Sequence, residues 1–261
     1  FASCQSSYQE LPDDTVLNQL LANNPDSLAT LLEEDINPFL LSDMERADYG
    51  WWLTNAHRKQ NRNLINDTLI FYTLDYYKTM DSPRLLDTYL LAAEQANSSG
   101  NQLLEKRKIL DKALELSQIK KDTFKVIETI SRIIHTYDAG EDVHRLQELI
   151  ELTKKYADNE HKIHSVLLLT RIYGRALMLD SVGKYSAIGM KMAREQNQPY
   201  LDYLFSRDYS KYLNFKGRDK EALKVLKEVE ARAEVGNEIM LNYIMTWTGL
   251  NNMDSAQVYI D

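Results

Sequence analysis

The chain has 261 residues, of which 44% are hydrophobic and 27% are charged, so it is neither a disordered chain nor a membrane bundle. Only 9 residues are glycine and 5 are proline, which is too few for the many tight turns of a β-sandwich or barrel. The formal net charge is −8 and basic residues occur only in short runs, which argues against direct nucleic-acid binding. The composition favours a soluble, nearly all-helical protein.

The single cysteine, Cys4, follows an apolar residue and two small residues at the start of the chain. This phrase resembles the end of a bacterial lipoprotein signal peptide, in which the cysteine becomes the lipidated N-terminus of the mature chain. Cys4 is therefore a lipidation candidate, and the alternative is a free thiol on a frayed terminus. No segment approaches the 18 apolar residues that a membrane-spanning helix needs.

Turn and capping signals divide the rest of the chain into helical hairpins with short connections. The Ser42–Glu45 phrase, for example, fits a capping box, in which each side chain bonds the backbone of the other residue. In chain order, helix starts are predicted near Asp13, Asn24, Ser42, Asn66, Ser82, Asn101, Asp122, Asp142, Asn159, Gln198 and Gly236.

A period of 34 residues runs through the last third of the sequence. It relates Gly183, Gly217 and Asn251, and also Ala222 and Ala256. Glycine adopts a left-handed backbone conformation freely and asparagine tolerably, so the first three residues are expected at the turn inside each hairpin. The two alanines suit the close crossing of paired helices.

This pattern resembles the tetratricopeptide repeat, most closely over residues 203–236. The resemblance implies an all-α, right-handed solenoid of about seven hairpins, the last of them truncated. Residues 1–12 would be an extended N-terminal segment, residues 13–168 irregular hairpins, and residues 169–261 repeats in 34-residue register. Because the sequence ends without the polar capping element that a solenoid needs, we expect more protein to follow.

Two short phrases, at residues 24–29 and 41–47, and the lipoprotein-like start suggest a narrower resemblance. Together they are similar to the exported tetratricopeptide proteins of Gram-negative anaerobes, whose N-terminal repeats are periplasmic. Many members continue into a transmembrane helix and a cytoplasmic helix-turn-helix DNA-binding domain, and others end as lipid-anchored repeat proteins. The resemblance implies a periplasmic, membrane-associated location in the cell envelope.

The first helices of a tetratricopeptide array line a concave groove, and the resemblance assigns the groove residues. Arg207 and Lys211 are four residues apart, so they present two cations on one helix face that suit a carboxylate or an acidic peptide. The alternative is a solvated face, or an ion pair with Asp208 or Asp202. The groove candidates are Thr170, Tyr173, Leu177, Arg207, Lys211, Asn214, Leu241, Met245 and Thr248.

Catalytic and metal-binding patterns are weak in this sequence. It contains no nucleophile elbow, zincin motif, phosphate loop or calcium loop. His161 and His164 can share a helix face, but two ligands do not complete a zinc site. We therefore expect no catalytic residues, no metal and no cofactor.

The sequence thus predicts a non-enzymatic module that binds a protein or peptide segment in a concave groove. The leading hypothesis is the periplasmic sensing or interaction region of a membrane-tethered regulator, without nucleic-acid binding by this segment. The alternative is a lipid-anchored scaffold of an envelope complex. A third reading, an enzyme with an α-helical toroid fold, would need paired carboxylates in a closed ring.

Overall fold

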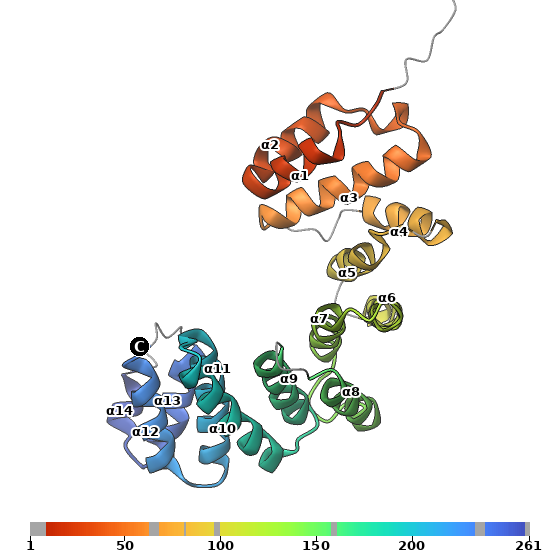
Figure 1. Cartoon of the computed structure of the whole chain (residues 1–261). Helices are drawn as coiled ribbons and strands as arrows, with labels where there is room; N and C mark the ends of the chain where they lie inside the picture. Colours follow the sequence, from red (N-terminus) through yellow and green to blue (C-terminus); the bar gives the residue numbers. More distant parts are fainter. Residues whose placement is uncertain are drawn as a thin grey trace, which may run out of the picture. The chain divides into compact units, whose positions relative to one another are not determined.

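All regular elements in the described part of the chain are helical. The computed structural model describes residues 9–62, 68–80, 82–96, 100–157, 161–232 and 238–258, and these ranges contain no β-strand (Figure 1). The all-α class is therefore confirmed. Cys4 lies outside the described residues, as do the expected helix starts at Asn66, Asn159 and Gly236.

The chain divides into two compact units, residues 1–122 and 123–261, and within each unit successive helices pack against one another. The first unit contains α1 (Asp14–Asn23), α2 (Pro25–Thr30), the π-helical turn η1 (Leu31–Asp35), the 3₁₀ turn η2 (Pro38–Leu40), α3 (Asp43–Lys59), α4 (Leu69–Thr79), α5 (Leu85–Gln95) and α6 (Gly100–Ile119). The second contains α7 (Thr123–Ile134), α8 (Val143–Lys155), α9 (Lys162–Arg175), α10 (Leu179–Glu195), α11 (Pro199–Phe215), α12 (Asp219–Glu230), α13 (Glu238–Gly249) and α14 (Met253–Gln257).

Helix α3 forms the centre of the first unit. It begins with the predicted capping box, in which the Glu45 backbone N–H bonds the Ser42 hydroxyl and the Ser42 backbone N–H bonds the Glu45 carboxylate. Trp52 is fully buried against residues of α1 and α2, and Trp51 is half-buried. Adjacent helical residues point about 100° apart, yet the two rings meet edge to face, with their centroids 4.7 Å apart.

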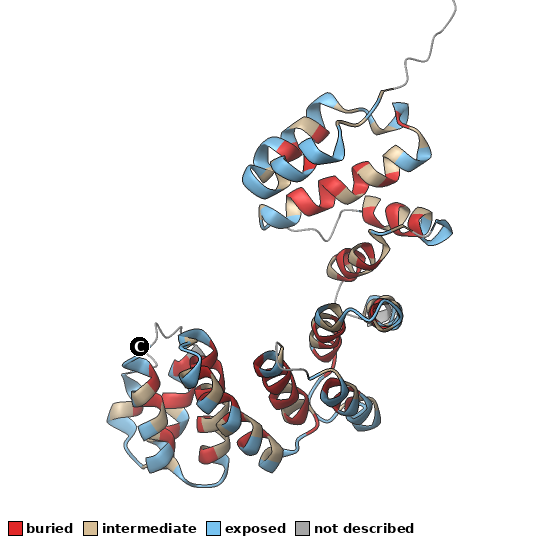
Figure 2. Ribbon diagram, viewed as in Figure 1, coloured by how far each residue is buried: buried red, intermediate tan, exposed pale blue. Residues whose placement is uncertain are grey.

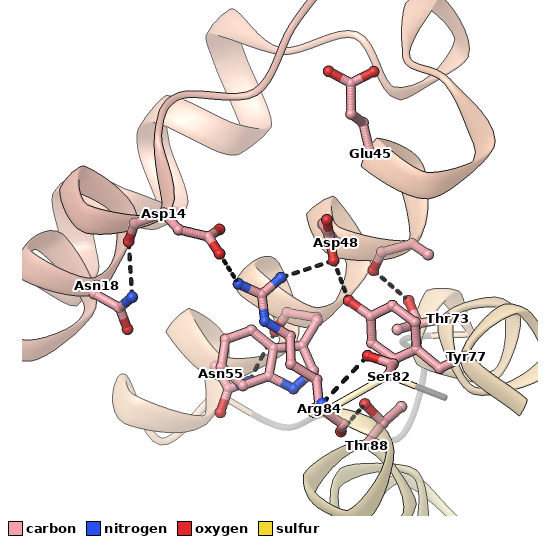
Figure 3. A network of polar contacts seen from close by, with 12 residues as sticks. Asp14, Asn18, Glu45, Asp48, Asn55, Thr73, Tyr77, Ser82, Arg84 and Thr88 are labelled. Atoms are coloured by element: carbon pink, nitrogen blue, oxygen red, sulfur yellow. Dashed lines mark hydrogen bonds and ion pairs between the residues drawn. The ribbon is translucent and has the colours of Figure 1, made fainter. Parts of the chain in front are cut away.

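Arg84, which directly precedes α5, forms ion pairs with residues of α1 and α3 and so links the three helices (Figure 3). One guanidinium nitrogen of Arg84 lies 2.7 Å from the Asp48 carboxylate on α3, and another lies 2.5 Å from Asp14 on α1. Its charged carbon lies 4.8 Å and 4.9 Å from the Trp51 and Trp52 rings. Burial alone would lower the pKa of Arg84, but its hydrogen bond to Asp14 and its other polar contacts raise it.

We expect the Arg84→Met variant to lower the free energy of unfolding by roughly 2–3 kcal/mol, because Asp48 loses a charged hydrogen bond in a partly buried position. Asp14 is more exposed, so Asp14→Asn should cost less than about 1 kcal/mol. Urea unfolding followed by tryptophan fluorescence measures both. Equal losses in the two variants would contradict the contribution assigned to the Asp48 pair.

Four helices of the second unit, α9, α10, α11 and α13, end in the same hydrogen-bonded turn. After α9, the Leu177 N–H bonds the Gly174 carbonyl at 3.2 Å, and the Met178 N–H bonds the Tyr173 carbonyl at 2.9 Å. This is the Schellman arrangement, which places one residue in the left-handed conformation. The same pair of bonds ends α10, α11 and α13, with the left-handed position at Asn197, Gly217 and Asn251 respectively.

The predicted turn residues are confirmed in two of three hairpins. Gly217 and Asn251 have φ of +68° and +55° and lie at turns, as expected. Gly183 does not, because it lies within α10, and the corresponding turn residue is Leu177 with φ of +58°. The turns at Leu177 and Gly217 are therefore 40 residues apart instead of 34, and the 34-residue spacing holds only between Gly217 and Asn251.

Small residues on α10 allow α11 to pack closely against it, and the contact surface is largely buried (Figure 2). A methyl group on Gly183 would lie 2.5 Å from the Tyr212 ring, and one on Gly189 would overlap the fully buried Phe205 ring. Gly183, which the sequence analysis predicted at a turn, is therefore a glycine that allows two helices to pack closely. Substitutions at these two positions would force α10 and α11 apart.

The Gly189→Ala variant should lose about 1–3 kcal/mol of unfolding free energy, since the added methyl group overpacks the contact with Phe205. Gly174→Ala is the matched control, because a methyl group there would lie 4.0 Å from a Val182 side-chain atom, which is an ordinary van der Waals contact. The control should be neutral or gain up to about 1 kcal/mol from helix propensity. Urea unfolding followed by circular dichroism distinguishes them. Similar stabilities would contradict close packing at Gly189.

Candidate functional site

The second unit contains a pocket of about 590 Å³, formed mainly by α9 and α11. We call it the basic pocket. The C-terminal halves of α9 and α11 form its sides, and the end of α7 and the start of α10 complete it. It is lined by Ile134, His135, Ala139, Thr170, Arg171, Gly174, Arg175, Leu177, Leu179, Val182, Arg207, Asp208, Lys211, Tyr212 and Phe215.

Four cations and one carboxylate line the basic pocket, in a chain whose net charge is −8. Arg171 and Arg175 lie one turn apart on α9, and Arg207 and Lys211 lie one turn apart on α11. The carboxylate belongs to Asp208, which pairs with the neighbouring Arg207 at 3.2 Å. Among the described residues, Arg171, Arg175 and Lys211 form no ion pair. Three of the four positive charges in the pocket are therefore not compensated by an ion pair, an arrangement that favours an anion.

The positive charge of the pocket affects the pKa of His135, which lies just after the end of α7. Desolvation lowers its pKa, and the nearby positive charges of Arg171 and Arg175 lower it further. At neutral pH the imidazole is therefore uncharged. It adds a hydrogen-bonding group to the pocket wall without adding to the repulsion among the four cations. Perturbed titratable groups in a concave site are a physical indicator of function.

The apolar part of the lining makes the basic pocket more than a patch of surface charge. Leu177 and Phe215 are 61% and 63% exposed, and both contribute to the wall. The pocket thus offers charge and apolar surface together, the combination typical of ligand sites.

Four of the nine residues predicted for the groove line the basic pocket. These are Thr170, Leu177, Arg207 and Lys211. Tyr173 is buried and stacks on Tyr185 with a centroid separation of 5.2 Å.

The other four predicted groove residues lie on α11 and α13, away from the pocket lining. Asn214 exchanges hydrogen bonds with Thr246 at 3.0 Å and 3.1 Å, so it joins α11 to α13. Leu241, Met245 and Thr248 are exposed side chains on α13.

The sequence analysis missed Arg171, Arg175 and His135, which supply much of the pocket's character. No signal in the sequence marks the first two, because the spacing that relates them to α11 follows from the left-handed turn at Leu177. With a spacing of 40 residues, Arg171 corresponds to Lys211 and Arg175 to Phe215, whereas the 34-residue register places Tyr173 and Leu177 opposite Arg207 and Lys211.

A second hollow, of about 440 Å³, lies beside Arg84 in the first unit and also includes Asp14, Asp48 and Tyr77 in its lining. Its charges compensate one another. Arg84 contacts both carboxylates, and the Tyr77 hydroxyl donates a hydrogen bond to Asp48 (Figure 3). Burial and the hydrogen bond to Asp48 raise the pKa of Tyr77. The network serves to hold helices together and leaves less charge for a ligand than the basic pocket does.

His161 and His164 line a third hollow, between α7 and α9. His161 also stacks loosely on Phe124, with a centroid separation of 5.9 Å. The described residues contain no group of three or more side chains suited to hold a metal ion.

Comparisons with known proteins identify no relative. No protein-family model, no curated protein and no solved structure matches the chain. None of the helices in the described ranges has the length and apolar character needed to span a membrane.

The pKa of His135 should rise in the Arg175→Gln variant, because one of the charges that disfavour its protonation is removed. It should not return fully to the ordinary value of 6.5, because Arg171 and the desolvation remain. NMR titration of the imidazole measures the change. Lys191→Gln, at an exposed position on α10, is the control and should leave the titration unaltered. A His135 pKa unaffected by Arg175→Gln would show that the two groups do not interact.

Proposed function

We propose that this chain is a non-enzymatic helical-repeat module that binds an acidic segment of a protein or peptide in the basic pocket. One observation carries the proposal: Arg171, Arg175 and Lys211 converge on the pocket without carboxylate partners among the described residues. A ligand with at least two adjacent negative charges would relieve their mutual repulsion. Such charge complementarity contributes to specificity and to the rate of association.

The shape and composition of the pocket support a peptide as the occupant. Arginine side chains bind carboxylates through two parallel hydrogen bonds, and α9 and α11 present their cations from two sides of the pocket. The apolar wall at Leu177 and Phe215 suits the aliphatic parts of a chain molecule. A volume of about 590 Å³ accommodates a few residues.

Only the family resemblance supports a location in the cell envelope. We propose that the module acts on the periplasmic side of a membrane, as the sensing or interaction region of a membrane-tethered regulator or, alternatively, as a lipid-anchored scaffold. The resemblance of the first four residues to a lipoprotein signal end supports an anchor at Cys4. Mass spectrometry of the N-terminal peptide from native membranes would test it, since an unmodified Cys4 contradicts lipidation.

The double variant Arg175→Gln plus Lys211→Gln should bind acidic peptides at least about tenfold more weakly than the unaltered chain, because each charged hydrogen bond contributes roughly 1.5–3 kcal/mol. The probe is a fluorescein-labelled peptide with two adjacent glutamates in a serine-glycine background, and fluorescence polarisation measures its affinity. The same peptide with glutamines in place of the glutamates should bind weakly to all forms of the protein.

The matched control removes two positive charges elsewhere. Lys108→Gln plus Lys112→Gln changes the net charge equally at exposed positions on α6, and it should retain the affinity of the unaltered chain. If both double variants weakened peptide binding equally, the loss of affinity would reflect the overall charge of the protein and not the pocket. Full affinity in the pocket variant would overturn the proposed site.

A further inference from the structure

We propose that the acidic segment carries a large apolar side chain three to four residues from its acidic pair, and that this side chain occupies a second pocket between α7 and α9. The inference rests on the proposed function and narrows its ligand to a bipartite peptide. The second pocket has a volume of about 330 Å³, and we call it the apolar pocket. It is lined by Phe124, Ile127, Glu128, Ser131, Arg132, His161, His164, Leu167, Leu168 and Arg171.

The two pockets lie along the same face of α9. His164, Leu168 and Arg171 line the apolar pocket, and Arg171 and Arg175 line the basic pocket. Residues separated by three or four positions share a helix face, so these four side chains form one continuous stripe. Arg171 belongs to both pockets and marks the point where they join.

Helix α7 and the residue after it repeat this arrangement 40 residues earlier in the chain. Phe124, Glu128 and Ser131 line the apolar pocket, and His135 lines the basic pocket. Because α7 packs against α9 and both stripes pass the two pockets in the same order, the pockets are neighbours along this pair of helices. One extended segment could therefore contact both.

The lining of the apolar pocket suits an apolar side chain. Ile127, Leu167 and Leu168 are buried at its base, and the Phe124 ring is 56% exposed at its edge. The charged lining residues Glu128 and Arg132 form an ion pair with each other at 2.9 Å. Glu128 also pairs with Lys125 at 3.0 Å. Glu128 and Arg132 thus compensate each other, and the remaining charge in the lining belongs to Arg171, which the apolar pocket shares with the basic pocket.

The distance between the pockets sets the spacing of the ligand. On α9, Leu167 lines the apolar pocket and Arg175 lines the basic pocket, and these residues are separated by about 12 Å at a helical rise of about 1.5 Å per residue. An extended peptide advances about 3.4 Å per residue. Three to four residues therefore separate the apolar side chain from the acidic pair. A longer or shorter spacing would leave one pocket empty.

A series of fluorescein-labelled peptides tests this spacing by fluorescence polarisation. Each peptide has two adjacent glutamates and one leucine placed one, three, four or eight residues away, on either side, in a serine-glycine background. The reference has alanine in place of leucine. A leucine at three or four residues, on one side, should strengthen binding by about tenfold or more over the reference, because burial of a leucine side chain contributes that much.

The Phe124→Ala variant should remove the gain from leucine and leave the affinity for the alanine peptide unchanged. Phe124→Leu should retain most of the gain. Phe39→Ala is the matched control, since Phe39 is an exposed phenylalanine in the first unit, 85% accessible, and it should behave as the unaltered chain does.

The outcomes separate the two proposals. If the alanine peptide binds and leucine adds nothing at any spacing, or adds equally at all spacings or in Phe124→Ala, the bipartite ligand is wrong and the basic pocket stands. If the alanine peptide does not bind to the unaltered chain, the proposed function fails and this inference fails with it.

Discussion

The left-handed residue that ends a helix determines which side chains of that helix face the groove. Leu177 ends α9 and Gly217 ends α11, and both turns use the same pair of hydrogen bonds. Counting back six residues from each turn reaches Arg171 and Lys211, and both of these residues line the basic pocket. Because these turns lie 40 residues apart, α9 and α11 each carry a cation at the same distance from the turn that ends the helix. A displaced turn would rotate these side chains away from one another.

The two units use arginine for different purposes. In the first unit, Arg84 meets two carboxylates and two indole rings, so its charge is compensated and the helices are held together. In the second unit, Arg171 and Arg175 form no ion pair with a described residue, and their charge contributes to lowering the pKa of His135. Unpaired, partly buried charge is unfavourable for the folded state. Under the proposed function, the ligand supplies the missing negative charge.

Local signals in the sequence predicted most of the helices, because caps and turns depend on neighbouring residues. The Ser42 capping box and the turns at Gly217 and Asn251 are examples. Gly183 could not be interpreted locally, because a glycine that admits the Tyr212 ring looks the same in sequence as a glycine that turns the chain. Leucine is unfavourable in the left-handed conformation, so nothing in the sequence marked Leu177 as a turn. The register error concealed Arg171 and Arg175.

Leu177 combines two properties that are seldom selected together. Its backbone adopts a conformation that favours glycine, and its side chain is 61% exposed in the wall of the basic pocket. Strained residues persist where function offsets their unfavourable energy. A screen for thermostability alone would therefore favour glycine here and shorten the apolar wall in the same step. Under the proposed function, stability and ligand recognition compete at this single position, so variants improved for one should be checked for loss of the other.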